Sequence, residues 1–535
     1  MGGVTLHMKR NDERKGAEMA TVRYKLSDLT EERAEQAVSE PTGKRYGMVS
    51  LWFGVFAAAL LNLLSVAFAF SLHVRQLLPL KWEFFAFLGI LLVNVYVDTA
   101  LIFVRRRRER PLRIFRFSAY VLALVLAIVM SAGMYYLHTI GSVLNAISSA
   151  KLEKVQLSIL VEQADSAADE KAVQGQTVHA VMQRDGESAQ TILTALGADS
   201  IQDVASYPAL VGELYAKHAR FILLNEAYRS IIEELHPKFS SETRVLKTYT
   251  VDLRTAPQGN DGKQPEQDSM RSYEPGEVDG LSPFLIYVSG NDTYGPIGTV
   301  SRSDVNIVIA VNPQSHRMTM VTVPRDSYVP IAGGGNGYKD KLTHAGIYGI
   351  EASIGTLANL FDLPIEAYAR VNFSSVIQLV DAMGGITVEN PRYFTTADYE
   401  FDEGSIRLNG DEALAFARER YGLADGDFER GRNQLRVIEA MFNEIIKPDN
   451  LLRFQSIMDV VREGVDTDLS ADAMSALVRN QLASGASWTI ERISVDGYGA
   501  SGLESYAMPG WNLSMVVLED DSLEAARDAL RAALS

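Results

Sequence analysis

Apolar positions along the chain follow two different patterns. Three long runs, at residues 47–72, 83–104 and 117–137, are almost free of charged side chains. Each reaches the ~20 residues that a helix needs to cross a bilayer. From residue 148 onward the apolar runs are short and are separated by turn residues, as in a soluble α/β protein. The pattern therefore predicts three transmembrane helices followed by soluble domains.

Arginines indicate how these helices are oriented. The loop between the second and third runs carries arginine at positions 105–108, 110, 113 and 116. Because basic loops stay in the cytoplasm, residues 1–46 are expected there too, and the chain after residue 138 is expected outside. Asp98, inside the second run, is either a functional intramembrane carboxylate or, as we favour, a residue near the cytoplasmic interface.

The soluble part divides into a small domain, a linker and a larger domain. Within residues 148–254, strand-like runs at 155–161 and 244–251 alternate with helical ones at 207–217 and 227–235, which predicts a small α/β unit without catalytic spacing. Residues 255–281 are polar with Pro and Gly, and are predicted to be a linker. The larger domain then covers residues 282–535.

A hairpin in the larger domain collects charged side chains at one edge of a sheet. β-branched runs at 305–311 and 318–323 are joined by N-P-Q-S-H-R, which has turn chemistry. If Asn312 pairs with Arg317 beside the turn, Asp304 pairs with Arg325 at the other end. A strand at 284–288 that runs parallel to the second arm ends at the same edge. The side chains expected there are Arg302, Asp304, Arg325, Asp326 and Asp292.

Two helices are expected to border this edge. Asn372 begins a helix that Gly384 ends, and its apolar stripe predicts packing on the sheet. Asn409 begins another, with Ala413, Phe416 and Ala417 inward. Arg418 and Arg420 can face one ligand only if that helix ends near Arg418.

A third helix brings further cations. Asp427 is predicted to cap it, and Arg430 and Gln434 are i, i+4 neighbours on one face. A helix N-terminus with an arginine in its first turn favours anions. Fixed cations that meet a few carboxylates describe a site for a polyanion and its metal, because guanidinium groups match phosphate oxygens. Some arginines are instead expected to be surface ion pairs, namely Arg317, Arg392 and Arg436.

Composition excludes several other functions. The chain has no cysteine, so disulfides, thiolate metal sites and cysteine nucleophiles are excluded. Neither H-E-x-x-H nor G-x-S-x-G occurs, and G-G-G-N-G at 333–337 lacks the ending of a P-loop, which leaves a flexible loop. The net charge of −16 argues against nucleic acid as a partner. An exported domain without disulfides suits a bacterial surface.

From residue 283 to the end, the ordered motifs S-G-N-D, R-S-D, V-P-R-D, D-K-L-T-H, A-R-E-R and G-D-F-E-R resemble the LytR-CpsA-Psr family of cell-wall glycopolymer ligases. The resemblance implies an α/β/α sandwich with a mixed sheet. It also implies an enzyme that moves a polyprenyl-pyrophosphate-linked glycopolymer, such as teichoic acid or capsule, onto peptidoglycan. Asp292 and Asp304 would hold Mg²⁺ or Mn²⁺. The residues implied to bind pyrophosphate are Arg302, Arg325, Lys341, Arg418, Arg420, Arg430 and Gln434.

Two positions depart from the family pattern, Tyr294 and Asn433, where the family commonly has arginine. Some capsule-linked members carry an accessory domain where residues 148–254 lie. The expected reaction is phosphoryl transfer with release of polyprenyl phosphate, catalysed by Arg325, Arg418 and Arg420, with Asp326 and Asp427 as candidate general bases. Two alternatives use the same site: a non-catalytic sensor or scaffold for lipid-linked glycopolymer, and a polyprenyl-pyrophosphate hydrolase.

Overall fold

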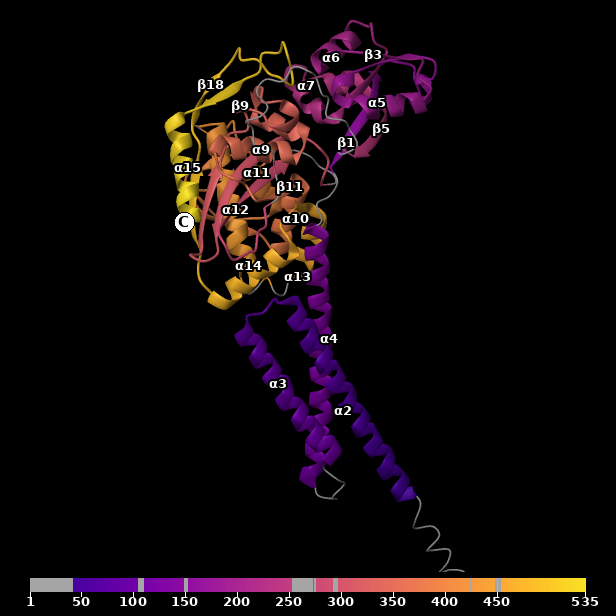
Figure 1. Ribbon diagram of the computed structural model, residues 1–535, viewed down its shortest axis with the longest axis vertical. Helices are drawn as coiled ribbons and strands as arrows, with labels where there is room; N and C mark the ends of the chain where they lie inside the picture. Colours follow the sequence, from indigo (N-terminus) through magenta and orange to yellow (C-terminus); the bar gives the residue numbers. More distant parts are fainter. Residues whose placement is uncertain are drawn as a thin grey trace, which may run out of the picture. The chain divides into compact units, whose positions relative to one another are not determined.

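The computed structural model describes residues 42–103, 110–148, 153–252, 273, 276–291, 297–423, 425–447, 450 and 454–535. The chain forms two compact units, with the boundary between Leu137 and His138. Among the sequence predictions, the tail at 1–41, arginines 105–108, most of the linker, Asp292 and Tyr294 lie outside the described residues. Figure 1 gives the element labels used below.

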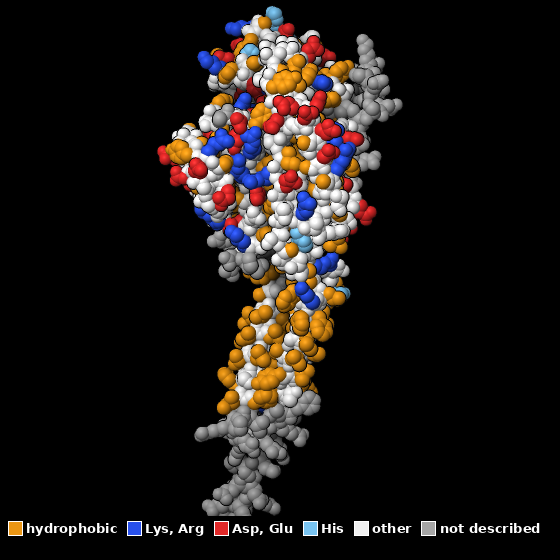
Figure 2. Space-filling view, turned by 90° about the vertical axis from the view of Figure 1, so that its left-hand side faces the viewer, with side chains coloured by type: hydrophobic (Ala, Val, Ile, Leu, Met, Phe, Trp, Pro, Cys, Tyr) orange, Lys and Arg blue, Asp and Glu red, His pale blue; other side chains and the backbone are white. Residues whose placement is uncertain are grey.

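The first unit is built from α2 (Thr42–Arg75), α3 (Leu80–Asp98) with a π-helical turn (Thr99–Phe103), and α4 (Arg110–Ser148), which continues into the second unit. Each helix contains a stretch long and apolar enough to cross a membrane. Large apolar side chains such as Phe70 and Leu124 are exposed on these helices, and Figure 2 shows hydrophobic side chains covering them. Within the described residues, three such helices are found, and they match the three predicted apolar runs.

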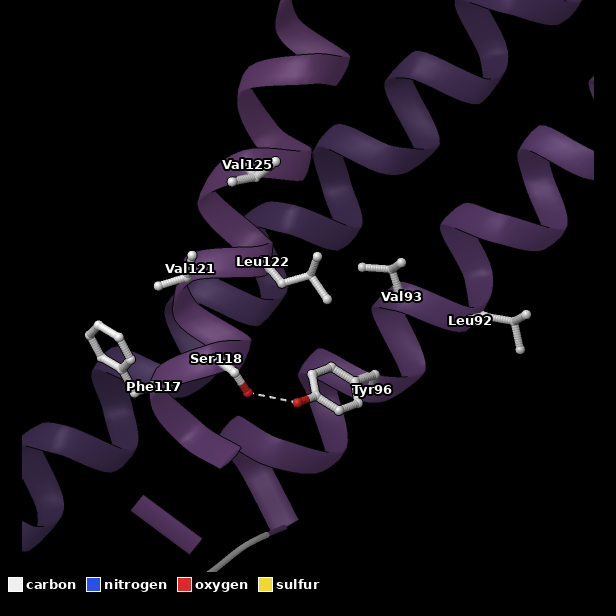
Figure 3. Close-up of a pocket in the computed structure, with 8 residues that line it drawn as sticks. All are labelled: Leu92, Val93, Tyr96, Phe117, Ser118, Val121, Leu122 and Val125. Carbon is white, nitrogen blue, oxygen red and sulfur yellow. Dashed lines mark hydrogen bonds between the residues drawn. The ribbon is translucent and has the colours of Figure 1, made fainter. Parts of the chain in front are cut away.

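Polar contacts and one groove lie between these helices. Asn62 on α2 donates to Asp98 Oδ1 at 3.1 Å and Oδ2 at 3.2 Å, so this carboxylate has a partner within the helix bundle. A groove between α3 and α4 contains one polar contact, between Tyr96 and Ser118 at 2.7 Å (Figure 3). Its lining is Leu92, Val93, Tyr96, Phe117, Ser118, Val121, Leu122 and Val125. No charged side chain is among these described lining residues.

The second unit begins with a small α/β subdomain, residues 153–252. Its sheet has the order β3-β2-β4-β1-β5. The strands are β1 (Lys154–Glu162), β2 (Thr177–Ala180), β3 (Ser200–Asp203), β4 (Phe221–Asn225) and β5 (Thr243–Asp252). The helices are α5 (Met182–Ala195), α6 (Tyr207–Tyr215), α7 (Arg229–Leu235) and α8 (Phe239–Glu242). We call this part the small subdomain and residues 276–535 the large subdomain.

The large subdomain is organised around a mixed six-stranded sheet of order β16-β11-β6-β7-β8-β17. The strands are β6 (Phe284–Asn291), β7 (Ser303–Asn312), β8 (Arg317–Thr322), β11 (Ala367–Asn372), β16 (Val465–Thr467) and β17 (Thr489–Ser494). Asn312 pairs with Arg317, which confirms the predicted hairpin register. β6 is antiparallel to β7 and therefore runs in the same direction as β8, although β7 lies between them. The predicted convergence of strand ends at one edge is correct.

Helices cover both faces of this sheet (Figure 1). Val308 and Ala310 of β7 belong to the same apolar core as residues of α9 (Ile350–Phe361) and α15 (Asp520–Leu534). Ile307 and Ile309 point to the opposite face, whose core includes residues of α12 (Asp427–Ile445) and α14 (Ala471–Ser484). A strand buried on both faces explains the continuous apolar run of β7. The α/β/α layering is confirmed.

Beside this sandwich lies a separate apolar cluster that changes one prediction. The helix capped by Asn372, α10 (Phe373–Met383), was expected on the sheet, but Val380 and Met383 pack with residues of α11 (Gly410–Arg418), α12 and α13 (Phe454–Gly464). Amphipathic spacing shows that one helix face is buried, but it does not identify the partner. The cluster also contains two short antiparallel pairs, β12 (Ile386–Asn390) with β15 (Gly404–Leu408), and β13 (Phe394–Thr395) with β14 (Glu400–Phe401).

The two subdomains share a core. Buried residues of the small subdomain form one cluster with Val300, Ile347 and Met508 of the large one. The Lys154 amide donates to the Gly298 carbonyl at 2.9 Å, and the Val300 amide to the Lys154 carbonyl at 2.8 Å. The remaining strands are β9 (Tyr328–Pro330), β10 (Lys339–Lys341), β18 (Gly497–Ala500) and β19 (Met515–Leu518). The small subdomain is thus packed against the region that carries the predicted site.

Candidate functional site

The hairpin places an arginine and an aspartate in direct contact. Arg325 follows β8, Asp304 lies near the start of β7, and Arg325 Nη1 is 2.7 Å from Asp304 Oδ1. Thr343, in the 3₁₀ segment Leu342–Tyr348, donates to the same oxygen at 3.2 Å. Arg302 Nη2 is 3.9 Å from Asp304 Oδ2. The sequence prediction that Arg302, Asp304 and Arg325 share one edge is therefore correct, and Thr343 is an addition to the predicted set.

Lys341 reaches this edge from β10. Its Nζ lies 3.2 Å from Asp326 Oδ1, and its side chain is only 4% exposed. Asp340, in the same strand, anchors it to neighbouring segments. Its carboxylate accepts from His344 at 2.8 Å, from Ser505 at 2.8 Å and from the Ala507 amide at 2.7 Å. A buried carboxylate with this many partners fixes the backbone beside Lys341. The lysine is consequently a rigid part of the site.

A cleft lies at the end of the hairpin, and the helix α12 borders it on a second side. Gln434, Arg430 and Asp427 line it together with Asp304 and Arg325. Asp427 is the first residue of the helix and pairs with Arg430; Gly426, with φ of 52°, occupies the N-cap position. Asp427 therefore does not cap the helix as predicted. Its carboxylate is instead used to hold Arg430.

The structure meets the condition under which Arg418 and Arg420 can face one ligand, namely that the helix ends near Arg418. The helix α11 ends at Arg418 and Glu419 is extended, so the two arginines are freed from helical spacing. Arg418 stacks on the Phe373 ring at 4.3 Å. Arg420 lies beside Tyr421, and its charge helps to lower the pKa of Asp326. Arg420 is thus near the cluster, whereas the contact seen for Arg418 is with α10.

The departure at Asn433 lies away from the cleft. Asn433 is buried and donates to the Phe416 carbonyl at 3.3 Å, so it joins α12 to α11. Of the arginines predicted to be surface ion pairs, Arg392 fits, at 3.5 Å from Glu429 and 45% exposed. Arg436 also pairs with Glu429, but it is largely buried. Arg317 is exposed and has no ion pair within the described residues.

Electrostatics favour the ionised forms of Asp304 and Asp326. Burial tends to raise the pKa of Asp304, but Arg302 and Arg325 outweigh it and hold the pKa below its usual value. Asp326 behaves alike: burial opposes ionisation, and Lys341 and Arg325 keep its pKa low. Burial lowers the pKa of Arg430, and nearby Arg325 adds to this effect although Asp427 opposes it. A guanidinium whose charge is disfavoured is stabilised further when an anion binds.

Among its described residues, the large subdomain contributes more positive than negative charge to this edge. The cations Arg302, Arg325, Lys341, Arg420 and Arg430 face the anions Asp304, Asp326 and Asp427. Two buried donors, Arg302 Nε and Arg325 Nε, have no hydrogen-bond acceptor among the described residues. Unpaired buried N–H groups are costly. Together with the charge excess, they make the edge suited to a polyanion such as pyrophosphate.

A divalent cation fits one part of the site. Asp304 Oδ2 is buried and has no hydrogen-bond partner among the described residues, so it can ligate a metal ion. Oxygen ligands favour Mg²⁺ or Mn²⁺. The second predicted ligand, Asp292, lies outside the described residues, and those described contain no group of three His, Asp or Glu side chains placed to hold a metal.

One site residue comes from the small subdomain and is not among the sequence predictions. Glu234 on α7 pairs with Arg302, and its Oε2 lies 3.2 Å from Lys341 Nζ. No motif marks Glu234, because the contact joins positions 68 and 107 residues apart. In the sequence it is only the second of two glutamates that follow Ile231 and Ile232 on a short helix.

The described residues define an α/β protein with three helices long and apolar enough to cross a membrane and a cluster of cations at one edge of a mixed sheet. The LytR_cpsA_psr family model matches residues 249–521, just over half of the chain. The chain belongs to the LytR_cpsA_psr family.

Two similar proteins share one name. A polyisoprenyl-teichoic acid–peptidoglycan teichoic acid transferase TagU from Halalkalibacterium halodurans is 37% identical over 225 residues, which cover 42% of this chain and 72% of that protein. TagU from Oceanobacillus iheyensis is 34% identical over 256 residues, 46% of this chain and 77% of the relative. The crystal structure of B. subtilis TagU has a TM-score of 0.37 and 29% identity, and covers 48% of this chain and 97% of its own.

Proposed function

We propose that this chain is a phosphotransferase that attaches a polyprenyl-pyrophosphate-linked glycopolymer to peptidoglycan and releases polyprenyl phosphate. The observation that carries the proposal is the gathering of cations at the end of the β7–β8 hairpin, where Arg302, Arg325, Lys341, Arg420 and Arg430 outnumber the four described carboxylates around them. The names of the relatives support teichoic acid as one such polymer. Capsular and other wall polysaccharides have the same donor chemistry.

Each charged side chain has a role in this reaction. Arg302, Arg325 and Lys341 bind oxygens of the pyrophosphate, and Asp326 holds Lys341 in place. Arg430, oriented by Asp427, binds the same group from α12. Arg418, Arg420 and Gln434 complete the binding set. A hydroxyl oxygen of a peptidoglycan sugar attacks the phosphorus that carries the glycan, and the bond from that phosphorus to the polyprenyl phosphate oxygen breaks.

Negative charge develops on the leaving group in this step. The leaving polyprenyl phosphate keeps the electron pair of the broken bond, and the arginines stabilise the negative charge that builds on it. Asp304, with Asp292, would hold Mg²⁺ or Mn²⁺, which when bound neutralises pyrophosphate charge. The hydroxyl proton passes to a base. Asp326 is a weak candidate because Lys341 and Arg325 outweigh burial and lower its pKa; Asp427 is the other carboxylate in reach of the cleft.

The proposed reaction requires the second unit outside the cell membrane. The three apolar helices support a membrane anchor, and the arginines at 105–116 support a cytoplasmic loop between the last two. Protease added to intact cells is expected to digest the chain after residue 138 and to spare that loop. Protection of the C-terminal part would contradict both the orientation and the extracellular reaction.

Transfer in a purified system tests the function. The full chain in detergent is supplied with Mg²⁺, radiolabelled lipid-linked glycopolymer and peptidoglycan, and label bound to sedimented peptidoglycan is measured together with free polyprenyl phosphate. The expected result is equal amounts of both products, and none without acceptor. Free glycan phosphate without acceptor would indicate a hydrolase. Donor binding without either product would indicate a sensor or scaffold.

A further inference from the structure

The strand β17 ends at the same edge of the sheet as β8. The two strands are parallel, with Ser494 opposite Thr322, and the Val495 amide donates to the Thr322 carbonyl at 3.0 Å. Ser494 therefore lies where the chain leaves β8 and leads to Arg325. The carboxyl ends of parallel strands are also the edge at which open α/β sheets bind their ligands.

Alternation along β17 turns Ser494 toward α12. Ile493 packs against the core on the side of α9 and α15. Arg492 points the other way and pairs with Glu439 of α12 at 3.1 Å. Successive side chains of a strand point to opposite faces of the sheet, so Ser494 shares the face of Arg492. Its side chain is therefore on the side of the helix that carries Arg430.

Ser494 lines the same cleft as two arginines of the site. Arg325 and Arg430 are both part of this lining. Gly431 brings α12 close to the end of β8, because a Cβ added at this position would lie 3.2 Å from Thr322 Cγ2. The helix, the end of β8 and the end of β17 thus meet around one cleft. Ser494 is the residue that β17 contributes to it.

The hydroxyl group of Ser494 is a buried donor without an acceptor. Its Oγ atom has no hydrogen-bond partner among the described residues, and the same holds for Arg325 Nε. A buried polar group left unpaired destabilises the folded chain, and such groups are rare in native proteins. Two unpaired donors on residues that line one cleft match a ligand with several acceptor oxygens. A phosphoryl group has such oxygens, and its negative charge strengthens the hydrogen bonds it accepts.

We propose that Ser494 is a further ligand-binding residue, whose hydroxyl donates a hydrogen bond to a phosphoryl oxygen held by Arg325 and Arg430. The proposal rests on the proposed function, which brings a lipid pyrophosphate into this cleft. It adds the edge strand β17 to the elements that form the site. In the ligand-free chain the hydroxyl is unpaired, and the ligand supplies its acceptor.

Binding of farnesyl pyrophosphate to the full chain tests this role. The probe is titrated in detergent with Mg²⁺ into wild type, Ser494→Ala and Arg325→Ala, and dissociation constants are measured by calorimetry. In Ser494→Ala the dissociation constant is expected to rise about tenfold or more, as for the loss of a hydrogen bond to a charged group. The control is Ser484→Ala, at an exposed serine whose Oγ lies 2.9 Å from His316 Nε2. It is expected to bind the probe like wild type.

Melting without the probe separates binding from a structural role. Because the Ser494 hydroxyl has no partner in the ligand-free chain, Ser494→Ala is expected to melt at or above the wild-type temperature. A lower melting temperature overturns the proposal, since a hydroxyl that stabilises the ligand-free chain has a partner there. An unchanged dissociation constant in Ser494→Ala, with weaker binding in Arg325→Ala, overturns it as well. Wild-type protein that does not bind the probe overturns the proposed function itself.

Discussion

The central sheet carries two clusters of arginine and carboxylate that differ in charge balance. On β11 and β16, Arg370 lies between two carboxylates, 2.5 Å from Glu153 and 2.6 Å from Asp466. At the end of the β7–β8 hairpin, five cations of the described residues meet four carboxylates, counting Arg302, Arg325, Lys341, Arg420 and Arg430 against Asp304, Asp326, Asp427 and Glu234. The first cluster has excess negative charge and the second excess positive charge.

The difference shows which property marks a ligand site. Arg370 Nε also lacks a hydrogen-bond acceptor among the described residues, just as Arg302 Nε and Arg325 Nε do. An unpaired guanidinium N–H is therefore not sufficient. Charge balance separates the clusters, because excess negative charge in the Arg370 cluster favours a proton or a cation, whereas excess positive charge in the hairpin cluster favours an anion. We accordingly assign a structural role to the first and a binding role to the second.

The largest expected effect is on stability, from Arg370→Ala. The variant leaves Glu153 and Asp466 buried without their cation, which costs ~3–5 kcal/mol in the free energy of unfolding. Thermal unfolding of the second unit measures this loss. Arg531→Ala, an exposed arginine on α15, is the matched control and should change stability by ~1 kcal/mol at most. Equal effects of the two substitutions would remove the distinction between the clusters.

Arg325→Ala is expected to affect activity more than stability. It removes charge-assisted hydrogen bonds worth ~1.5–3 kcal/mol, which corresponds to a ~10- to 100-fold fall in transfer rate. Arg302 and Arg430 remain near Asp304, so the melting temperature should fall less than for Arg370→Ala. Arg531→Ala should keep full transfer activity. A large loss of stability with normal activity per folded molecule would assign Arg325 to the structural class.

Asp304→Asn tests whether the positive cluster also holds a metal ion. The asparagine keeps the shape of the side chain but weakens binding of a divalent cation, so the Mg²⁺ concentration for half-maximal transfer should rise about tenfold or more. Asp496→Asn, at an exposed carboxylate, serves as the control. Transfer by Asp304→Asn that needs no more Mg²⁺ than wild type would place the metal elsewhere.

The smallest expected effect is a pH dependence from Glu153. Burial raises the pKa of Glu153 even though Arg370 opposes the shift. The folded chain then binds this proton more tightly than the unfolded chain does, so its contribution to stability is present below the ordinary glutamate pKa and is lost as pH rises through the raised one. Glu153→Gln should melt like wild type in acid and slightly higher above neutral pH. A difference that does not vary with pH would contradict this assignment.

Local sequence patterns were sufficient for much of the site. The turn N-P-Q-S-H-R and its flanking strands predicted the Asn312–Arg317 register, and this register brings Arg325 to Asp304. The end of α11 at Arg418 meets the condition that the spacing of Arg418 and Arg420 set for both to face one ligand. These features depend on residues close in sequence, or on a single hairpin, whose geometry is fixed by turn chemistry and strand periodicity. The three apolar helices could likewise be predicted from the length and composition of their segments.

Only the tertiary structure decided which distant groups meet. Glu234 reaches Arg302 and Lys341 because the small subdomain packs against the large one, and Glu153 reaches Arg370 across 217 residues for the same reason. The packing of α10 on helices rather than on the sheet is a further case. Periodicity reveals that a face is buried, but the partner is selected by shape and charge complementarity between whole elements. A single sequence determines the local geometry of this site, while its charge balance is settled by the fold.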